Sequence, residues 1–282
     1  MNWLISILLG AVEGITEFLP ISSTGHLTIV EKLVGWQIDA PGVTAFTAII
    51  QIGSIAAAIV YFWKDIVRLV VAWFRGLFHK DQRGNDYRAA WAVIIGSIPI
   101  AVIGLVFKNV IETTLRSLWI VAVALIVWAF VMWAADRFSA SRGKKALRDE
   151  SSFTIVDGLI IGLVQCLALI PGVSRSGATI SAGLFRGLDR VTATRWSFFL
   201  GIPALAASGV LEAVTNVSNI SQGVGWGPTA VATIVAFVVG YAAIAWLLKF
   251  VSSNRFTLFI IYRIVIGLAV VALLVTGVLA AV

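Results

Sequence analysis

The chain has 282 residues, of which 60% are hydrophobic and only 12% are charged, and its formal net charge is +7. Soluble domains carry about a quarter charged residues, so this composition excludes an ordinary soluble protein and indicates an all-α polytopic membrane protein. The positive charge does not indicate nucleic-acid binding, because the basic residues lie in loops between apolar segments. The single cysteine, Cys166, excludes an intrachain disulfide and a cysteine-based metal cluster.

The first apolar segment predicts a hairpin and not a span. It lacks the basic region and the small-residue cleavage site of a signal peptide, so we expect it to remain in the protein. Residues 3–20 are too short for a comfortable span, are interrupted by Pro20 and Gly25, and are followed by the short apolar stretch 26–36. We therefore predict a re-entrant hairpin, whose irregular turn must be buried in protein or line a wet cavity.

Further along the chain, apolar segments alternate with loops. The segments long enough to cross a bilayer are 44–63, 90–108, 117–135, 195–214, 228–250 and 256–280. Between the third and the fourth lie two short apolar stretches, 153–170 and 178–186, which are separated by PGVSRSGAT, residues 171–179. This interrupted pair predicts a second re-entrant hairpin.

Lysine and arginine are concentrated in four connecting segments, which are 64–89, 136–152, 186–195 and 249–255. Basic loops stay in the cytoplasm. We therefore predict that these segments share the cytoplasmic side and that both termini lie outside. The first hairpin would then begin and end outside, and the second would begin and end inside.

The two hairpins match each other at a constant offset of 152 positions. The identical pairs are Gly10 and Gly162, Val12 and Val164, Ser22 and Ser174, and Gly25 and Gly177. Three predicted spans follow each hairpin, and because three is odd the second copy would be inverted. We therefore predict one integral membrane domain, 1–282, built from inverted-topology repeats of about 1–140 and about 150–282. Such repeats, with broken helices that meet near the midplane, are typical of transporters.

Ionisable and hydroxyl side chains gather at the turns of both hairpins. Glu13 and Glu17 are four residues apart and lie on one helix face, a spacing that suits a divalent cation held through oxygen ligands. Arg175 offers a planar fork suited to phosphate, and His26 could shuttle a proton. The candidate nucleophiles are Ser22, Ser23, Ser174 and Ser176. Together these groups indicate phosphoryl transfer or phosphate recognition.

Other interpretations of the same residues remain open. An acidic pair in a membrane helix also suits a proton relay or a sodium site of a transporter. The hydroxyls could instead connect helices through hydrogen bonds. Arg263, in the apolar last span, could face the site, pair with a glutamate or reach towards the interface.

The sequence EGITEFLPISSTGH (13–26), together with PGVSRSGAT (171–179), resembles the bacterial undecaprenyl-diphosphate phosphatase family, the bacitracin-resistance proteins. The resemblance extends over nearly the whole chain, including IIQIGSIAAAIVYFW (49–63) and the pair Tyr262–Arg263. It implies a hydrolase of the bacterial cytoplasmic (inner) membrane that removes the terminal phosphate of undecaprenyl diphosphate and depends on a divalent cation. The family thereby recycles the lipid carrier for peptidoglycan and other envelope glycans.

The resemblance and the chemistry together assign expected roles. We expect catalysis by Glu17, Ser23, His26 and Arg175, binding of the diphosphate by Ser22, Ser174, Arg175, Ser176, Thr179 and Arg263, and binding of Mg²⁺ or Ca²⁺ by Glu13 and Glu17. The nucleophile is left open between Ser23, His26 and water, with a preference for Ser23.

The expected partners are a polyprenyl diphosphate and membrane lipid, without nucleic acid. The site is expected to open to the outer (periplasmic) face, because the carrier is released there after glycan transfer. The sequence leaves open the oligomeric state, with a homodimer as one alternative. It also leaves open the main functional alternative, a transporter or flippase for a phosphate-bearing lipid or anion that performs no hydrolysis.

Overall fold

The computed structural model describes residues 3–38, 40–107, 110, 111, 115, 117–143 and 146–281, without the side chains of 212, 213, 216–218, 221 and 222. The named elements in this part of the chain are all helical. The α-helices are α1 Trp3–Phe18, α2 Ser23–Leu33, α3 Pro41–Tyr61, α4 Trp63–Phe78, α5 Asn85–Val106, α7 Leu118–Ser141, α8 Ile155–Gln165, α9 Arg175–Phe185, α10 Arg190–Gln222, α11 Trp226–Ser253 and α12 Thr257–Val275. Short 3₁₀ turns are η1 Lys80–Gln82, η4 Glu150–Ser152 and η5 Cys166–Leu169.

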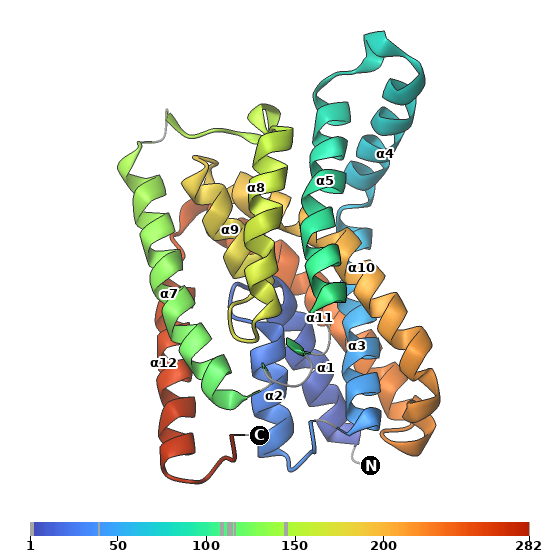
Figure 1. Ribbon diagram of the computed structural model, residues 1–282, viewed down its shortest axis with the longest axis vertical. Helices are drawn as coiled ribbons and strands as arrows, with labels where there is room; N and C mark the ends of the chain where they lie inside the picture. Colours follow the sequence, from blue (N-terminus) through green and yellow to red (C-terminus); the bar gives the residue numbers. More distant parts are fainter. Residues whose placement is uncertain are drawn as a thin grey trace.

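Five of the described helices are long and apolar enough to cross a membrane, namely α3, α5, α7, α11 and α12. The multi-pass, all-α architecture predicted from composition is therefore confirmed. The sixth predicted span, 195–214, lies within α10. Some side chains of α10 are not described, so α10 was not tested as a span and this part stays a prediction. α4 was not expected as a separate element. It follows α3 after a break at Phe62 and packs beside α5 (Figure 1).

Two pairs of short helices in contact, α1 with α2 and α8 with α9, occupy the segments for which hairpins were predicted. α1 and α2 run from the end of the molecule where both termini lie, whereas α8 and α9 run from the opposite end (Figure 1). Each pair turns near the middle of the molecule, and the two turns lie next to each other there. The interruptions at Pro20 and at Pro171–Gly172 therefore mark helix ends in the interior.

Glycines bring the hairpin helices close to their neighbours. α1 packs along α11, and a methyl group on Gly10 would overlap the carbonyl oxygen of Ala232. α8 packs along α5, and a methyl group on Gly162 would overlap the carbonyl oxygen of Gly96. Small residues at helix interfaces allow this backbone approach, which replaces the hydrophobic effect as the source of helix association in lipid. Each hairpin is thus fixed against a long helix of the other half of the chain.

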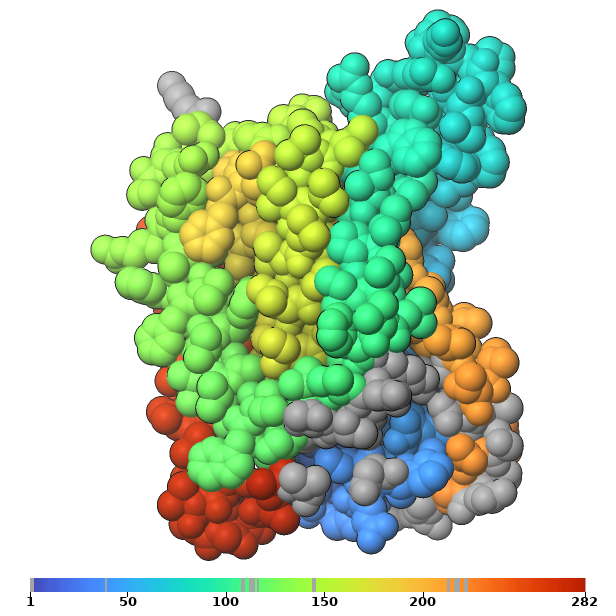
Figure 2. Space-filling view, viewed as in Figure 1, coloured from blue at the N-terminus to red at the C-terminus, as the bar shows by residue number. Residues whose placement is uncertain are grey.

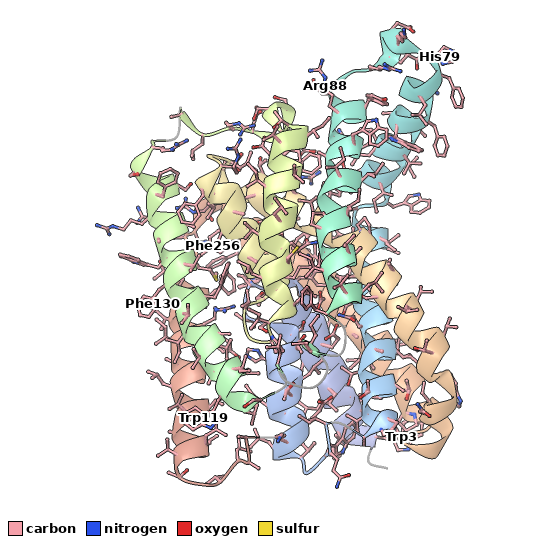
Figure 3. The ribbon with its side chains drawn as sticks, viewed as in Figure 1. Trp3, His79, Arg88, Trp119, Phe130 and Phe256 are labelled. Atoms are coloured by element: carbon pink, nitrogen blue, oxygen red, sulfur yellow. The ribbon has the colours of Figure 1, made fainter. Side chains whose placement is uncertain are left out.

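The outer surface of the bundle is apolar. Figure 2 shows α8 between α7 and α5 on one face of the molecule. Large side chains on α7, among them Trp119 and Phe130, point away from the bundle (Figure 3) and are exposed. An apolar exterior of this kind is what a surface solvated by lipid requires.

Charged residues gather at the end of the molecule opposite the termini, near His79 and Arg88 (Figure 3). There Asp157, in the first turn of α8 and outside the five candidate spans, accepts hydrogen bonds from Arg148 at 2.6 Å and Arg186 at 2.8 Å. Burial alone would raise the pKa of Asp157, but the hydrogen bonds from Arg148, Thr154 and Arg186 outweigh it and lower the pKa to about 2. This cluster anchors the second hairpin at its open end.

Candidate active site

Both hairpin turns end in a serine with unusual backbone geometry. Ser22 has φ 78° and Ser174 has φ 77°, and they are the non-glycine residues with positive φ in the described chain. Each serine is the N-cap of its following helix, where its Oγ accepts from the amide of Gly25 at 3.3 Å or of Gly177 at 3.1 Å. A non-glycine residue in this region costs on the order of 1–3 kcal/mol, and such strain is often found at functional sites.

The two turns contact each other directly. The amide of Gly172 donates to Ser22 Oγ at 3.1 Å, and Ser176 Oγ donates to the carbonyl oxygen of Leu19 at 3.1 Å. Residues from the first and second hairpins therefore form one site. This juxtaposition is the arrangement expected from the two polar motifs.

Arg263 joins the same two turns from α12. Its fully buried guanidinium donates to the carbonyl oxygens of Pro20 at 3.1 Å and Gly172 at 2.7 Å, and to those of Ala124 and Leu125 in α7. The sequence had allowed Arg263 to face the site, to pair with a glutamate or to reach the interface. In the structure it faces the two turns, and it contacts their backbone carbonyl oxygens. These contacts support a positioning role, and binding of phosphate by Arg263 stays a prediction.

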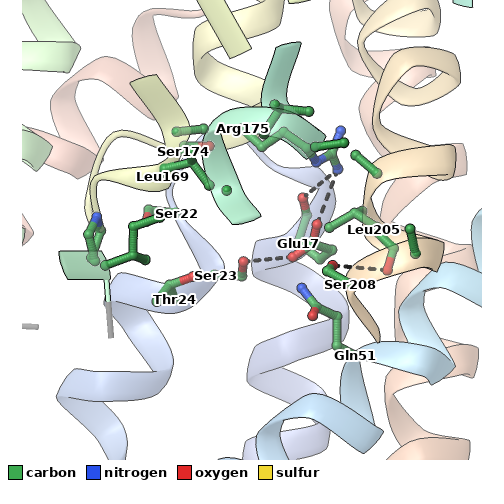
Figure 4. Close-up of a pocket in the computed structure, with 18 of the residues that line it drawn as sticks. Glu17, Ser22, Ser23, Thr24, Gln51, Leu169, Ser174, Arg175, Leu205 and Ser208 are labelled. Carbon is green, nitrogen blue, oxygen red and sulfur yellow. Dashed lines mark hydrogen bonds and ion pairs between the residues drawn. The ribbon is translucent and has the colours of Figure 1, made fainter. Parts of the chain in front are cut away.

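A cavity of about 660 Å³ opens beside the paired turns (Figure 4). Its polar wall is formed by Glu17, Ser22, Ser23, Thr24, Gln51, Ser174, Arg175 and Ser208. The remaining wall is apolar and comes largely from α5 and α10, including Ile100, Leu105 and Leu205. The cavity therefore has the amphiphilic character needed for a molecule with a charged head and a hydrocarbon chain. The first turns of α2 and α9 line its polar side, where helix N-termini favour an anion.

Glu17 connects the two hairpins within this cavity. Its Oε1 accepts from Arg175 Nη2 at 3.2 Å, and its Oε2 accepts from Ser23 Oγ at 2.7 Å (Figure 4). Glu17 is 5% exposed, so little water competes for these contacts. A buried carboxylate that already holds a serine hydroxyl can accept its proton. The contacts bring together three of the four predicted catalytic residues.

Arg175 is oriented by α9 and α10. Its Nη1 donates to the carbonyl oxygen of Ser197 at 3.0 Å, while its buried Nε has no hydrogen-bond partner. Thr179, fully buried one turn further along α9, donates to the carbonyl oxygen of Arg175 at 2.8 Å and also contacts Ser197 Oγ at 2.7 Å. Thr179 therefore supports the arginine and is not part of the cavity wall. Its expected contact with the diphosphate stays untested, as does that of Ser176.

His26 points towards α12. Its Nδ1 lies 2.8 Å from the carbonyl oxygen of Ser22, and its Nε2 lies 2.8 Å from the Tyr262 hydroxyl. A carbonyl oxygen can only accept, so we assign the proton to Nδ1 and the acceptor role to Nε2. Both ring nitrogens are engaged, and His26 does not line the cavity. The structure therefore favours Glu17 over His26 as the group nearest the serine hydroxyl.

The predicted carboxylate pair is divided between two cavities. Glu17 lines the first, whereas Glu13 lines a second cavity of about 300 Å³ beside it. Among the described residues no three histidine, cysteine, aspartate or glutamate side chains are grouped closely enough to hold a metal by themselves. Oxygen groups such as Glu13 and the hydroxyls nearby nevertheless fit Mg²⁺ or Ca²⁺, because these cations accept hydroxyl and water ligands as well as carboxylates.

Sequence reasoning missed some residues of the site. Gln51 lines both cavities, and Ser197 and Tyr262 orient Arg175 and His26. Gln51 could have been found as the one carboxamide in the apolar stretch 44–63, which contains no charged residue. The contact made by Ser197 runs through its backbone carbonyl, which has no sequence signature.

These features define a polytopic α-helical membrane protein with an internal amphiphilic cavity and a partly buried serine–glutamate–arginine cluster. The chain belongs to the family described as "Bacitracin resistance protein BacA", which matches residues 6–269. It is 60% identical over its full length to a protein of Cutibacterium acnes named undecaprenyl-diphosphatase, all of which is covered. It is also 55% identical over its full length to undecaprenyl-diphosphatase 3 of Frankia casuarinae, again covered completely. Against undecaprenyl-diphosphatase 1 of Streptomyces avermitilis the identity is 54%, with 97% of each chain covered.

Proposed function

We propose that the protein hydrolyses undecaprenyl diphosphate to undecaprenyl phosphate and inorganic phosphate, and so recycles the lipid carrier for peptidoglycan and other envelope glycans. The observation that carries this proposal is the first cavity, which combines an apolar wall with the Ser23–Glu17–Arg175 cluster. A prenyl chain fits the wall between α5 and α10, and a diphosphate fits the hydroxyls, guanidinium and helix N-termini at the turns. The names of the relatives support the same substrate.

The residues of the cluster suggest the course of the reaction. Glu17 accepts the proton of Ser23 as Ser23 Oγ attacks the terminal phosphorus, and the bond from that phosphorus to the bridging oxygen breaks. Glu17 gives this proton to the departing undecaprenyl phosphate. It then takes a proton from the water that attacks the phosphoserine and returns it to Ser23, releasing phosphate. Arg175 holds the equatorial oxygens, where negative charge is concentrated during transfer.

A divalent cation, Mg²⁺ or Ca²⁺, is part of this proposal. When bound, it would neutralise charge on the diphosphate. Glu17 is already engaged by Arg175 and Ser23, so Glu13 is the member of the predicted pair that retains an oxygen without a hydrogen-bond partner. Ser22 and Ser174, which line the cavity, are proposed to contact the diphosphate at its periphery.

The proposal is tested by phosphate release from a short-chain prenyl diphosphate, using detergent-purified protein and a divalent cation. We expect cation-dependent release that falls by ~10²-fold or more in Glu17→Gln, since the amide cannot accept the serine proton. A purified, folded protein that releases no phosphate with any divalent cation would favour the alternative, a transporter or flippase.

We further propose that the short helix pairs are re-entrant hairpins and that the two halves of the chain are inverted repeats. The matching geometry of Ser22 and Ser174 supports this, as does the packing of α1 on α11 and of α8 on α5. The concentration of charge at the end opposite the termini supports a cytoplasmic location for that end. The cavity would then open to the outer face of the cytoplasmic membrane.

Cysteine labelling in intact cells tests this orientation. In a variant with Cys166 replaced by alanine, an impermeant reagent should modify Leu33→Cys, at the end of α2, and should not modify Gln82→Cys, between α4 and α5. Both positions are exposed at the surface. The reverse labelling pattern would overturn the orientation.

A further inference from the structure

A third cavity lies on α4, at the end of the molecule opposite the termini, where α4 and the start of α5 extend beyond the other helices (Figure 1). Its volume is about 470 Å³. The residues that line it are Lys64, Val67, Arg68, Val71, Ala72, Arg75, Gln82 and Asp86. None of these residues lines either cavity at the hairpin turns, so this cavity is separate from the candidate active site.

The basic residues of this cavity form a stripe along one face of α4. Arg68 follows Lys64 by four positions and Arg75 follows Arg68 by seven, and these spacings place all three on the same side of a helix. Val67 and Val71 lie on the same face, and both are exposed. The cavity therefore presents cations and apolar side chains next to one another.

Two of the three cations are not compensated by a carboxylate. Arg68 contacts Asp65 at 3.1 Å and lies 3.8 Å from Asp86, so its charge is offset. None of the ion pairs between described residues includes Lys64 or Arg75, and both side chains are exposed. The cavity thus carries a surplus of positive charge, which an anion would neutralise.

The stripe lies where a lipid headgroup could reach it. Arg68 also contacts Glu150 in η4, directly before the second hairpin, so α4 lies beside the charged end of the bundle. Trp63 begins α4 and Phe74 lies near its end, and both are exposed. α4 is not among the five candidate spans of the described chain. A short helix with exposed aromatic and basic side chains is typical of the membrane interface.

We propose that this cavity binds the headgroup of an anionic phospholipid, with Lys64 and Arg75 as the cations that attract its phosphodiester. The two residues lie eleven positions apart, or about 16 Å along a helix, so the headgroup and the start of its acyl chains would lie along the stripe. The exposed Val67 and Val71 would contact the apolar part of the lipid, which favours a phospholipid over free phosphate. Binding of this lipid does not rest on the proposed function, because it takes place outside the candidate active site.

Native mass spectrometry of the full-length, detergent-purified protein can measure this binding without any prenyl diphosphate. Phosphatidylglycerol and phosphatidylcholine with identical acyl chains are titrated separately. We expect a Kd about tenfold or more lower for phosphatidylglycerol, because each uncompensated cation near the headgroups favours an anionic lipid. Lys64→Gln/Arg75→Gln should reduce this preference to less than about threefold.

Lys249→Gln/Arg255→Gln is the matched control. It removes the same charge from two exposed positions at the end of α11 and in the turn before α12, and it should leave the preference unchanged. Thermal unfolding should show that both double variants are folded. If Lys64→Gln/Arg75→Gln does not fold, Arg75→Gln takes its place and should raise the Kd for phosphatidylglycerol by about threefold to fivefold.

Three results would overturn the proposal. The first is an equal Kd of the wild type for the two lipids. The second is a preference for phosphatidylglycerol that the folded Lys64→Gln/Arg75→Gln variant retains, which would place the lipid elsewhere on the protein. The third is displacement of the lipid by inorganic phosphate, which would make free phosphate the ligand. Phosphate release from a prenyl diphosphate enters none of these measurements, so failure of the proposed function would leave the lipid site untouched.

Discussion

The hydroxyl of Tyr262 lies 2.8 Å from Nε2 of His26, and the two rings stack with their centroids 5.5 Å apart. Because Nδ1 of the same imidazole lies 2.8 Å from the carbonyl oxygen of Ser22, the ring connects α12 to the first turn of α2. In this arrangement His26 supports the backbone that carries Ser23. We therefore expect His26 to position Ser23 and not to contact the phosphate itself.

Tyr262→Phe should therefore have little effect on turnover. The change removes the hydroxyl and keeps the stacked ring, so we expect kcat to fall by less than ~5-fold, equivalent to under ~1 kcal/mol. Steady-state kinetics on the purified variant would measure it. A loss of ~10²-fold in kcat with unchanged thermal stability would instead place His26 and Tyr262 on the path of the proton.

Ser23→Ala should abolish turnover, with a fall of ~10³-fold or more, because it removes the hydroxyl that donates to Glu17 Oε2 at 2.7 Å. Thr24→Ala, at the adjacent position of the same cavity wall, is the matched control and should retain most activity. Acid quenching of the wild type with terminally ³²P-labelled substrate should trap label on the protein. Full activity in Ser23→Ala would point to water as the nucleophile.

Arg175→Lys separates charge from geometry. Lysine keeps the positive charge but cannot contact Glu17, Ser197 and a phosphate oxygen from one planar group. We expect kcat to fall by ~10²-fold or more, by analogy with the loss of a preorganised donor to a developing oxyanion, which costs ~3 kcal/mol. If only KM rises and kcat stays within threefold, Arg175 merely docks the headgroup.

Arg263→Lys should weaken the fold more than substrate binding. A lysine cannot reach all four carbonyl oxygens that the guanidinium contacts. The carbonyls of Pro20 and Gly172 lie at turns, and a buried acceptor left without a donor costs ~1–3 kcal/mol. We expect the apparent Tm in detergent to fall by ~5 °C or more. A KM for prenyl diphosphate that rises tenfold at unchanged Tm would show that Arg263 binds phosphate after all.

Asp157→Asn should destabilise the protein in a pH-dependent way. The folded-state pKa of Asp157 is lowered to about 2, below its unfolded value, so its ionised form stabilises the fold above pH ~4 and that contribution is lost as the pH falls through 2. We expect Asp157→Asn to lower the apparent Tm at pH 7, and the gap to the wild type to narrow below pH ~4. A gap that is constant across this range would mean that the ion pairs with Arg148 and Arg186 contribute little.

The site was predictable where its chemistry is carried by side chains. Interrupted apolar segments predicted the breaks between α1 and α2 and between α8 and α9, and the inverted order of the predicted repeats led us to expect that the two turns meet near the midplane. Periodicity placed Glu13 and Glu17 on one helix face but could not assign them to separate cavities. That division depends on which helices pack against each side of α1.

The role of Arg263 was harder to foresee for a related reason. An arginine in an apolar span indicates a buried partner, and the alternatives considered from the sequence were the site, a glutamate and the membrane interface. Backbone carbonyls at helix ends accept just as well, and they become available wherever a chain turns inside the protein. The turns at Pro20 and Gly172 supply such acceptors. Every residue type carries a backbone carbonyl, so these acceptors could not be predicted from the sequence.

The close approach of α1 to α11 and of α8 to α5 bears on inhibitor design. Where a methyl group on Gly10 or Gly162 would already overlap a neighbouring backbone, no small molecule can insert without separating whole helices. The apolar wall between α5 and α10 is built from side chains, which can move aside at lower cost. A useful inhibitor should therefore be an amphiphile that partitions into the bilayer first, and its potency should follow its lipid solubility as well as its charged head.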